Sequence, residues 1–171
     1  MTTKDIFDNV NGWLKFAEAK NASILAFNSA IIFGIFKIFP DSNSNSILFY
    51  YLCFVIFLLL VALTMSLISF IPMLKYTYIE FGEPSDKDNL LFFGDIAKYA
   101  DYNERYKRKV KEALTNTENG FDDFYISQTI INSKIAYIKY KQFEIAIWFT
   151  FAAILTPIGA YILWETQKLR A

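Results

Sequence analysis

The segment ILFYYLCFVIFLLLVALTMSLISFI, residues 47–71, decides the fold because it carries no charged side chain over its whole length. A helix that crosses a membrane needs about 20 apolar residues, so this segment is long enough to span. Two further apolar runs are ASILAFNSAIIFGIFKIF at residues 22–39 and IAIWFTFAAILTPIGAYILW at residues 145–164. At about 1.5 Å per residue, residues 22–39 cover roughly 27 Å, enough for a thin bilayer. The sequence therefore predicts three transmembrane helices.

The distribution of basic residues predicts the orientation of these helices. Residues 40–46 are polar and contain no Lys or Arg, whereas residues 72–144 hold eleven of the seventeen basic residues. Basic residues are enriched in cytoplasmic loops. We therefore expect residues 1–21 and 72–144 to be cytoplasmic, residues 40–46 to form an external turn, and residues 165–171 to form an external tail.

The composition excludes several classes of function. The chain has 171 residues and is 54% hydrophobic, which is too apolar for an ordinary soluble domain of this size. It has no histidine and a single cysteine, so the commonest general base, the commonest zinc ligand and an intramolecular disulfide are excluded. The net charge of zero provides no basic field for DNA or RNA. We expect no enzymatic activity and assign no catalytic residue, metal site or cofactor.

Residues 72–144, between the second and third apolar runs, are expected to form helices. One helix is expected over about residues 102–114, with Asp101 as its N-cap, and a turn is expected at residues 119–123. One long helix should then run from about Asp122 to Trp164. The residues expected to share its apolar face are those at positions 121, 124, 131, 135, 138 and 145.

The N-terminal part predicts a second long helix, because no proline lies between Asp5 and Phe39. The residues on one of its faces are Ile6, Val10, Trp13, Leu14, Ala17, Asn21, Ile24, Leu25 and Asn28. The predicted fold is therefore an all-α integral membrane protein. Its membrane helices are expected to continue as stalks into a small cytoplasmic helical cap.

Three residues within or beside the spans are candidates for membrane assembly. Asn28 lies one or two turns inside the first span, where an amide usually hydrogen-bonds between helices. Asn21 stands where that span enters the membrane, so it belongs either to the polar interface or to an inter-helix or ligand contact. Pro157 is tolerated in the third span if neighbouring groups satisfy the carbonyl that it leaves unpaired, and it predicts a kink.

The segment NLLFFGDIAKY, residues 89–99, places four large apolar residues in the most polar part of the chain. In one interpretation the LLFF run packs the loop onto the long helix and the lipid headgroup edge, and Gly94 permits the turn that follows. In the other, the same loop forms a wall of a ligand pocket. Phe92, Phe93 and Tyr99 are then the candidates for stacking on a base.

Two groups of basic residues are candidates for binding phosphate. RYKRK at residues 105–109 is either a face in contact with solvent or headgroups, or a phosphate site that includes Arg105. Lys134 and Lys139 alternate with tyrosines near the third span, which is typical of a belt at the membrane interface. The alternative is a phosphate contact beside an aromatic ring that stacks on a base.

Taken in order along the chain, these segments resemble one family. WLKFAEAKNASILAFNSA at residues 13–30, a second span ending near Pro72, NLLFFG at residues 89–94, and a helix with Lys134, Tyr137 and Lys139 entering a final span are similar to the transmembrane effectors of Pycsar. Pycsar is a bacterial anti-phage system. The resemblance covers nearly the whole chain.

The resemblance implies a signalling role. In such systems a phage-triggered nucleotide cyclase makes cyclic CMP (cCMP) or cyclic UMP (cUMP). The effector senses it and compromises the inner membrane, which stops growth or kills the cell. A homo-oligomer is expected, because three spans cannot enclose a sizeable pore. The ligand contacts would come from Phe92, Phe93, Tyr99, Arg105, Lys134 and Lys139. Two alternatives remain open, an effector for another messenger such as a cyclic oligonucleotide, and a structural membrane protein without a ligand.

Overall fold

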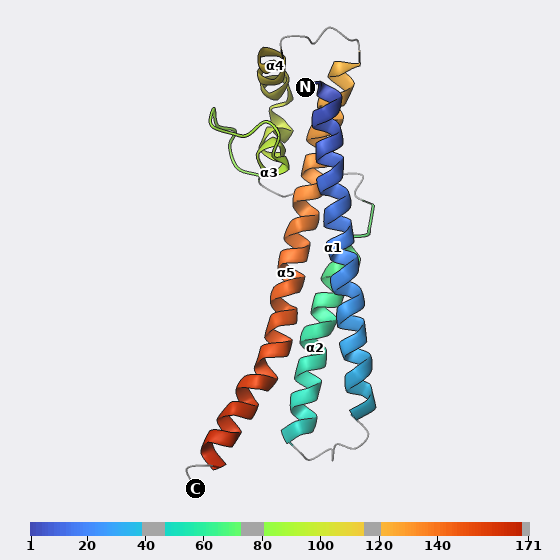
Figure 1. Cartoon of the computed structure of the whole chain (residues 1–171), viewed down its shortest axis with the longest axis vertical. Helices are drawn as coiled ribbons and strands as arrows, with labels where there is room; N and C mark the ends of the chain where they lie inside the picture. Colours follow the sequence, from blue (N-terminus) through green and yellow to red (C-terminus); the bar gives the residue numbers. More distant parts are fainter. Residues whose placement is uncertain (39–46, 73–80, 115–120, 169–171) are drawn as a thin grey trace. The chain divides into compact units, whose positions relative to one another are not determined.

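The computed structural model describes residues 1–38, 47–72, 81–114 and 121–168, whose regular structure is entirely helical (Figure 1). The elements are α1 (Thr3–Ile38), α2 (Ile47–Ile68), α3 (Phe93–Ile96), the 3-10 helix η2 (Ala97–Asp101), α4 (Asn103–Ala113) and α5 (Asp122–Lys168). The all-α fold class is therefore confirmed. The two predicted long helices are confirmed as α1 and α5, which continue without interruption beyond the apolar runs.

The chain divides into two compact units. The first, called here the polar unit, comprises Met1–Ala19 and Ile71–Lys141. The second, the apolar unit, comprises Lys20–Phe70 and Gln142–Ala171. Helices α1 and α5 each contribute residues to both units.

Two helices of the described residues, α1 and α2, are long and apolar enough to cross a membrane, as judged by length and composition. Only 17% and 22% of their most apolar windows are buried inside the chain. Their apolar side chains therefore face outward, as in helices surrounded by lipid and unlike the core helices of a soluble protein. The predicted third span lies within α5, but the side chains of residues 157–168, Pro157 included, are outside the described part. The predicted external turn at 40–46 and the end of the tail also lie outside it.

Small side chains line the interior of the apolar unit. Ala62 and Ala146 are fully buried beside Ile24, and Ala153 is buried beside Leu59. Small residues let helix backbones approach closely, which is how helices associate where lipid removes the hydrophobic driving force. These contacts join α1, α2 and α5 within the unit.

Asn28 bridges α1 and α5 inside the apolar unit, as the predicted inter-helix amide contact requires. Its Nδ2 atom donates to Thr150 Oγ1 at 2.9 Å, and Thr150 Oγ1 lies 3.1 Å from Asn28 Oδ1. Both residues are buried. Asn21 is also fully buried on α1, which places it inside the unit and not on an exposed interface.

Asn28→Leu is expected to lower the stability of the apolar unit by about 1 kcal/mol, the usual size of such a bond between membrane helices. The measurement is unfolding of the full chain by SDS titration in mixed micelles. Ser29→Ala is the matched control, because the exposed Ser29 hydroxyl donates within its own helix, to Leu25 O. A cycle with Thr150→Val that shows no coupling between the two positions would contradict the assigned contact.

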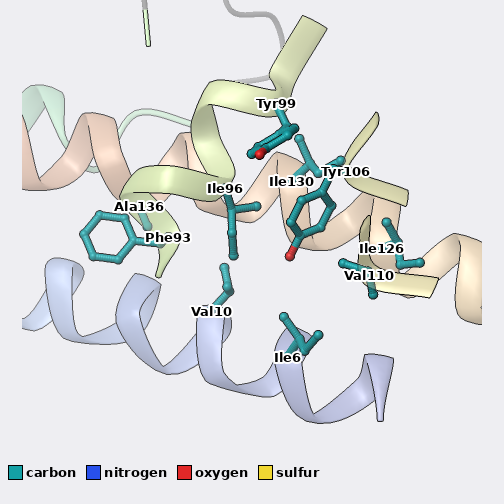
Figure 2. Close-up of a cluster of buried hydrophobic side chains, with 10 residues drawn as sticks. All are labelled: Ile6, Val10, Phe93, Ile96, Tyr99, Tyr106, Val110, Ile126, Ile130 and Ala136. Carbon is teal, nitrogen blue, oxygen red and sulfur yellow. The ribbon is translucent and has the colours of Figure 1, made fainter. Parts of the chain in front are cut away.

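The core of the polar unit is built from all its elements (Figure 2). Phe93, Ile96, Tyr99, Tyr106 and Val110 from the α3–α4 region lie between apolar residues of α1 and α5. The α1 and α5 members of this cluster are Ile6, Val10, Ile126, Ile130 and Ala136. The predicted apolar face of α1 is thus largely confirmed.

The predicted apolar face of α5 is wrong. Phe121, Phe124 and Ile131 are 71%, 68% and 42% exposed, and Ile145 is also exposed. Of the six expected positions, Ile138 alone is buried, and Ile135 is half-buried. The buried positions of α5 carry a mixture of polar, small and branched apolar side chains, namely Asp122, Ile126, Thr129, Ile130, Ser133, Ala136, Ile138, Lys139, Gln142, Ala146, Thr150 and Ala153. Small side chains such as Ser133 and Ala136 are fully buried there, whereas the largest apolar side chains of the expected face are exposed.

The expected start of the short polar helix also needs correction. Asp101 ends η2, and the residue that precedes α4 is Tyr102, which makes no side-chain capping bond. Helix α4 otherwise occupies the predicted segment. In the predicted turn at 119–123, Asp122 and Asp123 form the first turn of α5, where carboxylates interact favourably with the helix dipole. Residues 119 and 120 lie outside the described part.

Candidate functional site

The LLFF run divides between the core and the surface. Phe93 is 7% exposed and its ring stacks on Tyr140 of α5, with ring centroids 4.9 Å apart and planes at 17°. Trp13 of α1 lies 5.6 Å from the same Phe93 ring. Phe92 stays 43% exposed, with its ring 4.8 Å from that of Phe93. Phe93 therefore packs the segment onto the long helix, as the structural interpretation predicted, and Phe92 is the accessible ring.

Gly94 has a different role from the predicted one. It lies inside α3, and the positive-φ glycine of the described chain is Gly82. A Cβ atom on Gly94 would lie 2.5 Å from Cε1 of Phe92. The absence of a side chain at Gly94 therefore makes room for the Phe92 ring, and no unusual backbone conformation is involved.

Tyr99 is fully buried, and both its ring and its hydroxyl are engaged. The ring lies 5.3 Å from that of Tyr106. The hydroxyl donates to Ser85 O at 3.0 Å and accepts from Lys109 Nζ at 3.1 Å. Access of a ligand to the ring would require the segment to move. The hydroxyl instead fixes the turn around Ser85 beside α4.

Arg105 and Lys109 converge on one carboxylate that the sequence alone did not single out. Arg105 Nη2 and Lys109 Nζ each lie 3.0 Å from Asp86 Oδ1. Lys109 also donates to Ser85 O at 2.9 Å. The hydrogen bonds from Lys109 and Arg105 hold the pKa of the Asp86 carboxyl below its ordinary value of 3.8. Asp86 therefore stays ionised throughout the neutral range, and the pairing is lost only when the pH falls through that lowered pKa.

The remaining basic residues around α4 have carboxylate partners. Lys107 and Lys111 lie 3.5 and 2.9 Å from Asp123 at the start of α5. Lys98 is bonded to Asp95 and Asp88, and these bonds raise its pKa to about 12. Arg108 lies 4.0 Å from Glu112. The basic run is thus a solvent-exposed surface whose cations are paired with carboxylates.

Lys134 and Lys139 have partners of their own, separate from the Asp86 cluster. The Lys134 ammonium lies 5.5 Å from the centre of the Phe81 ring. Lys139 is 7% exposed, and its Nζ atom lies 3.1 Å from Glu18 Oε1 of α1. The structure thus links Tyr99 and Arg105 through Lys109 and Asp86, and it gives the other two predicted cations different neighbours.

A shallow hollow adjoins the Asp86 cluster at the start of α4. Its lining residues are Asp101, Tyr102, Asn103, Glu104 and Arg105. Tyr102 is 47% exposed, so its ring is available to a ligand, and two carboxylates flank it. Among the described residues, no group of three His, Cys, Asp or Glu side chains is arranged to hold a metal ion.

Sequence reasoning missed Asp86, Ser85 and Lys109 as parts of one arrangement. A local signal was present, since Ser85 N–H donates to Asp88 Oδ2 at 2.7 Å in a Ser-x-x-Asp turn. That pattern indicates a compact turn. It does not predict that Asp86 of this turn contacts Arg105 of α4, nineteen residues further along the chain.

Comparisons of the sequence with known proteins identify a family. The sequence model of the Pycsar effector protein domain, PycTM, matches residues 2–164. The Pycsar effector protein RsPycTM of a Rhizobium species is 30% identical over 166 residues, which cover 91% of this chain and 92% of that protein. No solved structure gives a significant match. The chain therefore belongs to the Pycsar effector family, whose members are effectors of anti-phage defence.

Proposed function

We propose that this effector senses cCMP or cUMP through its polar unit and then disrupts the bacterial inner membrane, which arrests or kills the infected cell. The family match over residues 2–164 carries the proposal, and the cyclic pyrimidine mononucleotide is the ligand that the resemblance to Pycsar effectors implies. A nucleotide cyclase activated by phage would supply the ligand. The paired cations of the polar unit provide the charge that a cyclic phosphate needs.

The proposed topology has three spans, at residues 22–39, 47–71 and 145–164. Its support is the outward-facing apolar surface of α1 and α2 and the concentration of basic residues between 72 and 144. In this topology the N-terminus and residues 72–144 are cytoplasmic, where a cyclic nucleotide is made, and the tail is external.

The proposed action on the membrane requires several copies of the chain. Three spans are too few to enclose a sizeable pore, so protomers would assemble around a symmetry axis. Helices α1 and α5 belong to both units, so a change in the polar unit would involve helices that also form the apolar unit. The ligand shifts the assembly only to the extent that it binds the active state more tightly.

The test is dye leakage from liposomes that carry the purified full chain. cCMP, cUMP, cAMP and a cyclic dinucleotide are added separately, with linear 5′-CMP and protein-free liposomes as controls. Leakage with one cyclic pyrimidine alone is the expected result. Leakage with the dinucleotide alone would show that the effector responds to another second messenger. Absence of leakage with every nucleotide would contradict direct gating by a nucleotide.

A further inference from the structure

Two cations of α4 share one exposed anion in the polar unit. Arg105 and Lys109 are four residues apart, so their side chains lie on the same face of the helix. Both contact the same oxygen, Asp86 Oδ1, at 3.0 Å. Like charges at this spacing repel each other, and the carboxylate between them removes that repulsion. The pair therefore forms a cradle for one anionic oxygen.

The anion in this cradle is weakly held. The Asp86 side chain is 87% exposed, and exposed ion pairs contribute about 0–1 kcal/mol each. Asp86 belongs to the turn at residues 85–88 and to no helix. Competing anions therefore have access to the cradle from solvent. By contrast, Asp88 beside Lys98 has a side chain that is only 5% exposed, so the neighbouring pair is enclosed.

The charge of the cradle fits a cyclic phosphodiester. Arg105 and Lys109 carry two positive charges and Asp86 one negative charge, so one positive charge is left over when Asp86 occupies the site. A cyclic mononucleotide carries a single negative charge, and its phosphate oxygens accept the charge-assisted bonds that a carboxylate accepts. Exchange of Asp86 for such a ligand conserves the local charge balance.

The adjoining hollow provides contacts for the rest of the ligand. Arg105 belongs both to the cradle and to the lining of that hollow. Tyr102 offers an exposed ring on which a base can stack. Asp101 and Glu104 are exposed carboxylates that can accept a hydrogen bond from an N–H group of a base.

We propose that Arg105 and Lys109 form the phosphate site of the polar unit, and that Asp86 is its internal occupant, displaced when a cyclic mononucleotide binds. The inference rests on the proposed function and adds the site and its regulation. Displacement frees Asp86 from both cations and removes one of the anchors of the turn. Ser85 O of the same turn accepts bonds from Tyr99 and Lys109, and the bond from Lys109 is lost as Lys109 turns to the ligand. Asp88 keeps its pairing with Lys98.

The experiment measures binding of radiolabelled cCMP and cUMP to the full chain in nanodiscs. Asp86→Asn keeps the size of the side chain and removes its charge, so the cognate ligand should bind about five- to tenfold more tightly. Arg105→Gln should weaken binding at least about tenfold. Asp123→Asn is the matched control, since Asp123 also bridges two cations of α4 but lies outside the cradle, and its affinity should equal that of the wild type.

The outcomes separate this inference from the proposed function. Wild-type binding that neither Asp86→Asn nor Arg105→Gln changes would overturn the site and leave cyclic-nucleotide sensing intact. No binding by the wild type or by Asp86→Asn would overturn both. Binding by Asp86→Asn alone would support the internal occupant. Nanodiscs with and without anionic lipid distinguish a nucleotide phosphate from a lipid headgroup as the ligand of the cradle. If Asp86→Asn changes binding of anionic lipid and leaves nucleotide binding unchanged, the nucleotide assignment is overturned.

Discussion

Replacing Tyr106 by alanine is expected to lower the free energy of unfolding of the polar unit by about 3–5 kcal/mol, the usual cost of truncating a buried aromatic side chain. Tyr106 is fully buried between α1 and α5, and its hydroxyl donates to Leu90 O at 2.9 Å (Figure 2). The variant therefore leaves a large cavity and a carbonyl without its donor. Because this hydrogen bond is one of the contacts that hold the LLFF run, the loop should loosen with the core.

Hydrogen exchange of α4 amides in the full chain in nanodiscs is the measurement, since it reports the polar unit without unfolding the apolar unit. Tyr106→Phe should cost only about 1 kcal/mol, the value of the lost hydrogen bond. Tyr102→Ala is the matched control for stability, because Tyr102 is 47% exposed and precedes the same helix. Equal exchange in the Tyr106→Ala and Tyr102→Ala variants would contradict the assigned core.

Alkaline pH provides an independent check on the same side chain. Burial raises the pKa of Tyr106 above its ordinary value of 10.0. A group whose pKa is higher in the folded state stabilises that state fully below its unfolded pKa, and the contribution is lost as the pH rises further. Protection of α4 should therefore be constant up to about pH 10 and fall above it, and Tyr106→Phe should remove that component.

The elements that could be predicted from the sequence are those with one dominant signal. The uncharged run at residues 47–71 admits no alternative to a long apolar helix, and α2 is observed from Ile47 to Ile68. In α1, Ile6, Val10 and Ala17 recur at helical spacing among charged residues, so hydrophobicity alone identifies the inward face. All three are buried.

The inward face of α5 could not be found in this way, because apolar residues occur all round the helix. Periodicity then selects the largest side chains, and it selected Phe121 and Phe124, which are exposed. Packing selected Ser133 and Ala136, which are fully buried. Whether large or small side chains face inward depends on how closely the neighbouring helix approaches. The local sequence of α5 does not give that distance.

The sequence predicts which residue types form the candidate site. It does not predict which carboxylate or carbonyl each cation contacts. The sequence shows a basic run at residues 105–109 and predicts Arg105 as a phosphate contact. Its carboxylate comes from a turn nineteen residues earlier, and Lys109 is joined to that turn through Tyr99 and Ser85. Such pairing depends on how the loop folds back on α4. The order of charged residues along the chain therefore does not predict it.

Charge reversal at Lys139 should have the second largest effect. Lys139 is 7% exposed and lies 3.1 Å from Glu18, so Lys139→Glu places a buried carboxylate against another carboxylate. The Glu18 side chain is half-exposed, so the main cost is the buried carboxylate at position 139, which faces a carboxylate instead of a cation, and we expect a loss of about 3 kcal/mol. The measurement is hydrogen exchange in the first half of α5. Gln128→Glu is the control, because Gln128 lies in the first half of the same helix and is exposed.

The reversed pair decides whether Lys139 is a structural cation or a ligand contact. Glu18→Lys combined with Lys139→Glu restores opposite charges between α1 and α5, so protection should return to near the wild-type level. If leakage in response to the cognate cyclic nucleotide returns as well, the ligand does not need a cation at position 139, and the Arg105 and Lys109 cradle stands as the phosphate site. If protection returns but the response does not, Lys139 acts on the ligand itself, and the pairing with Glu18 is its resting state. If protection does not return, the buried contact is not an isolated ion pair, and the helices pack in a way that this geometry does not explain.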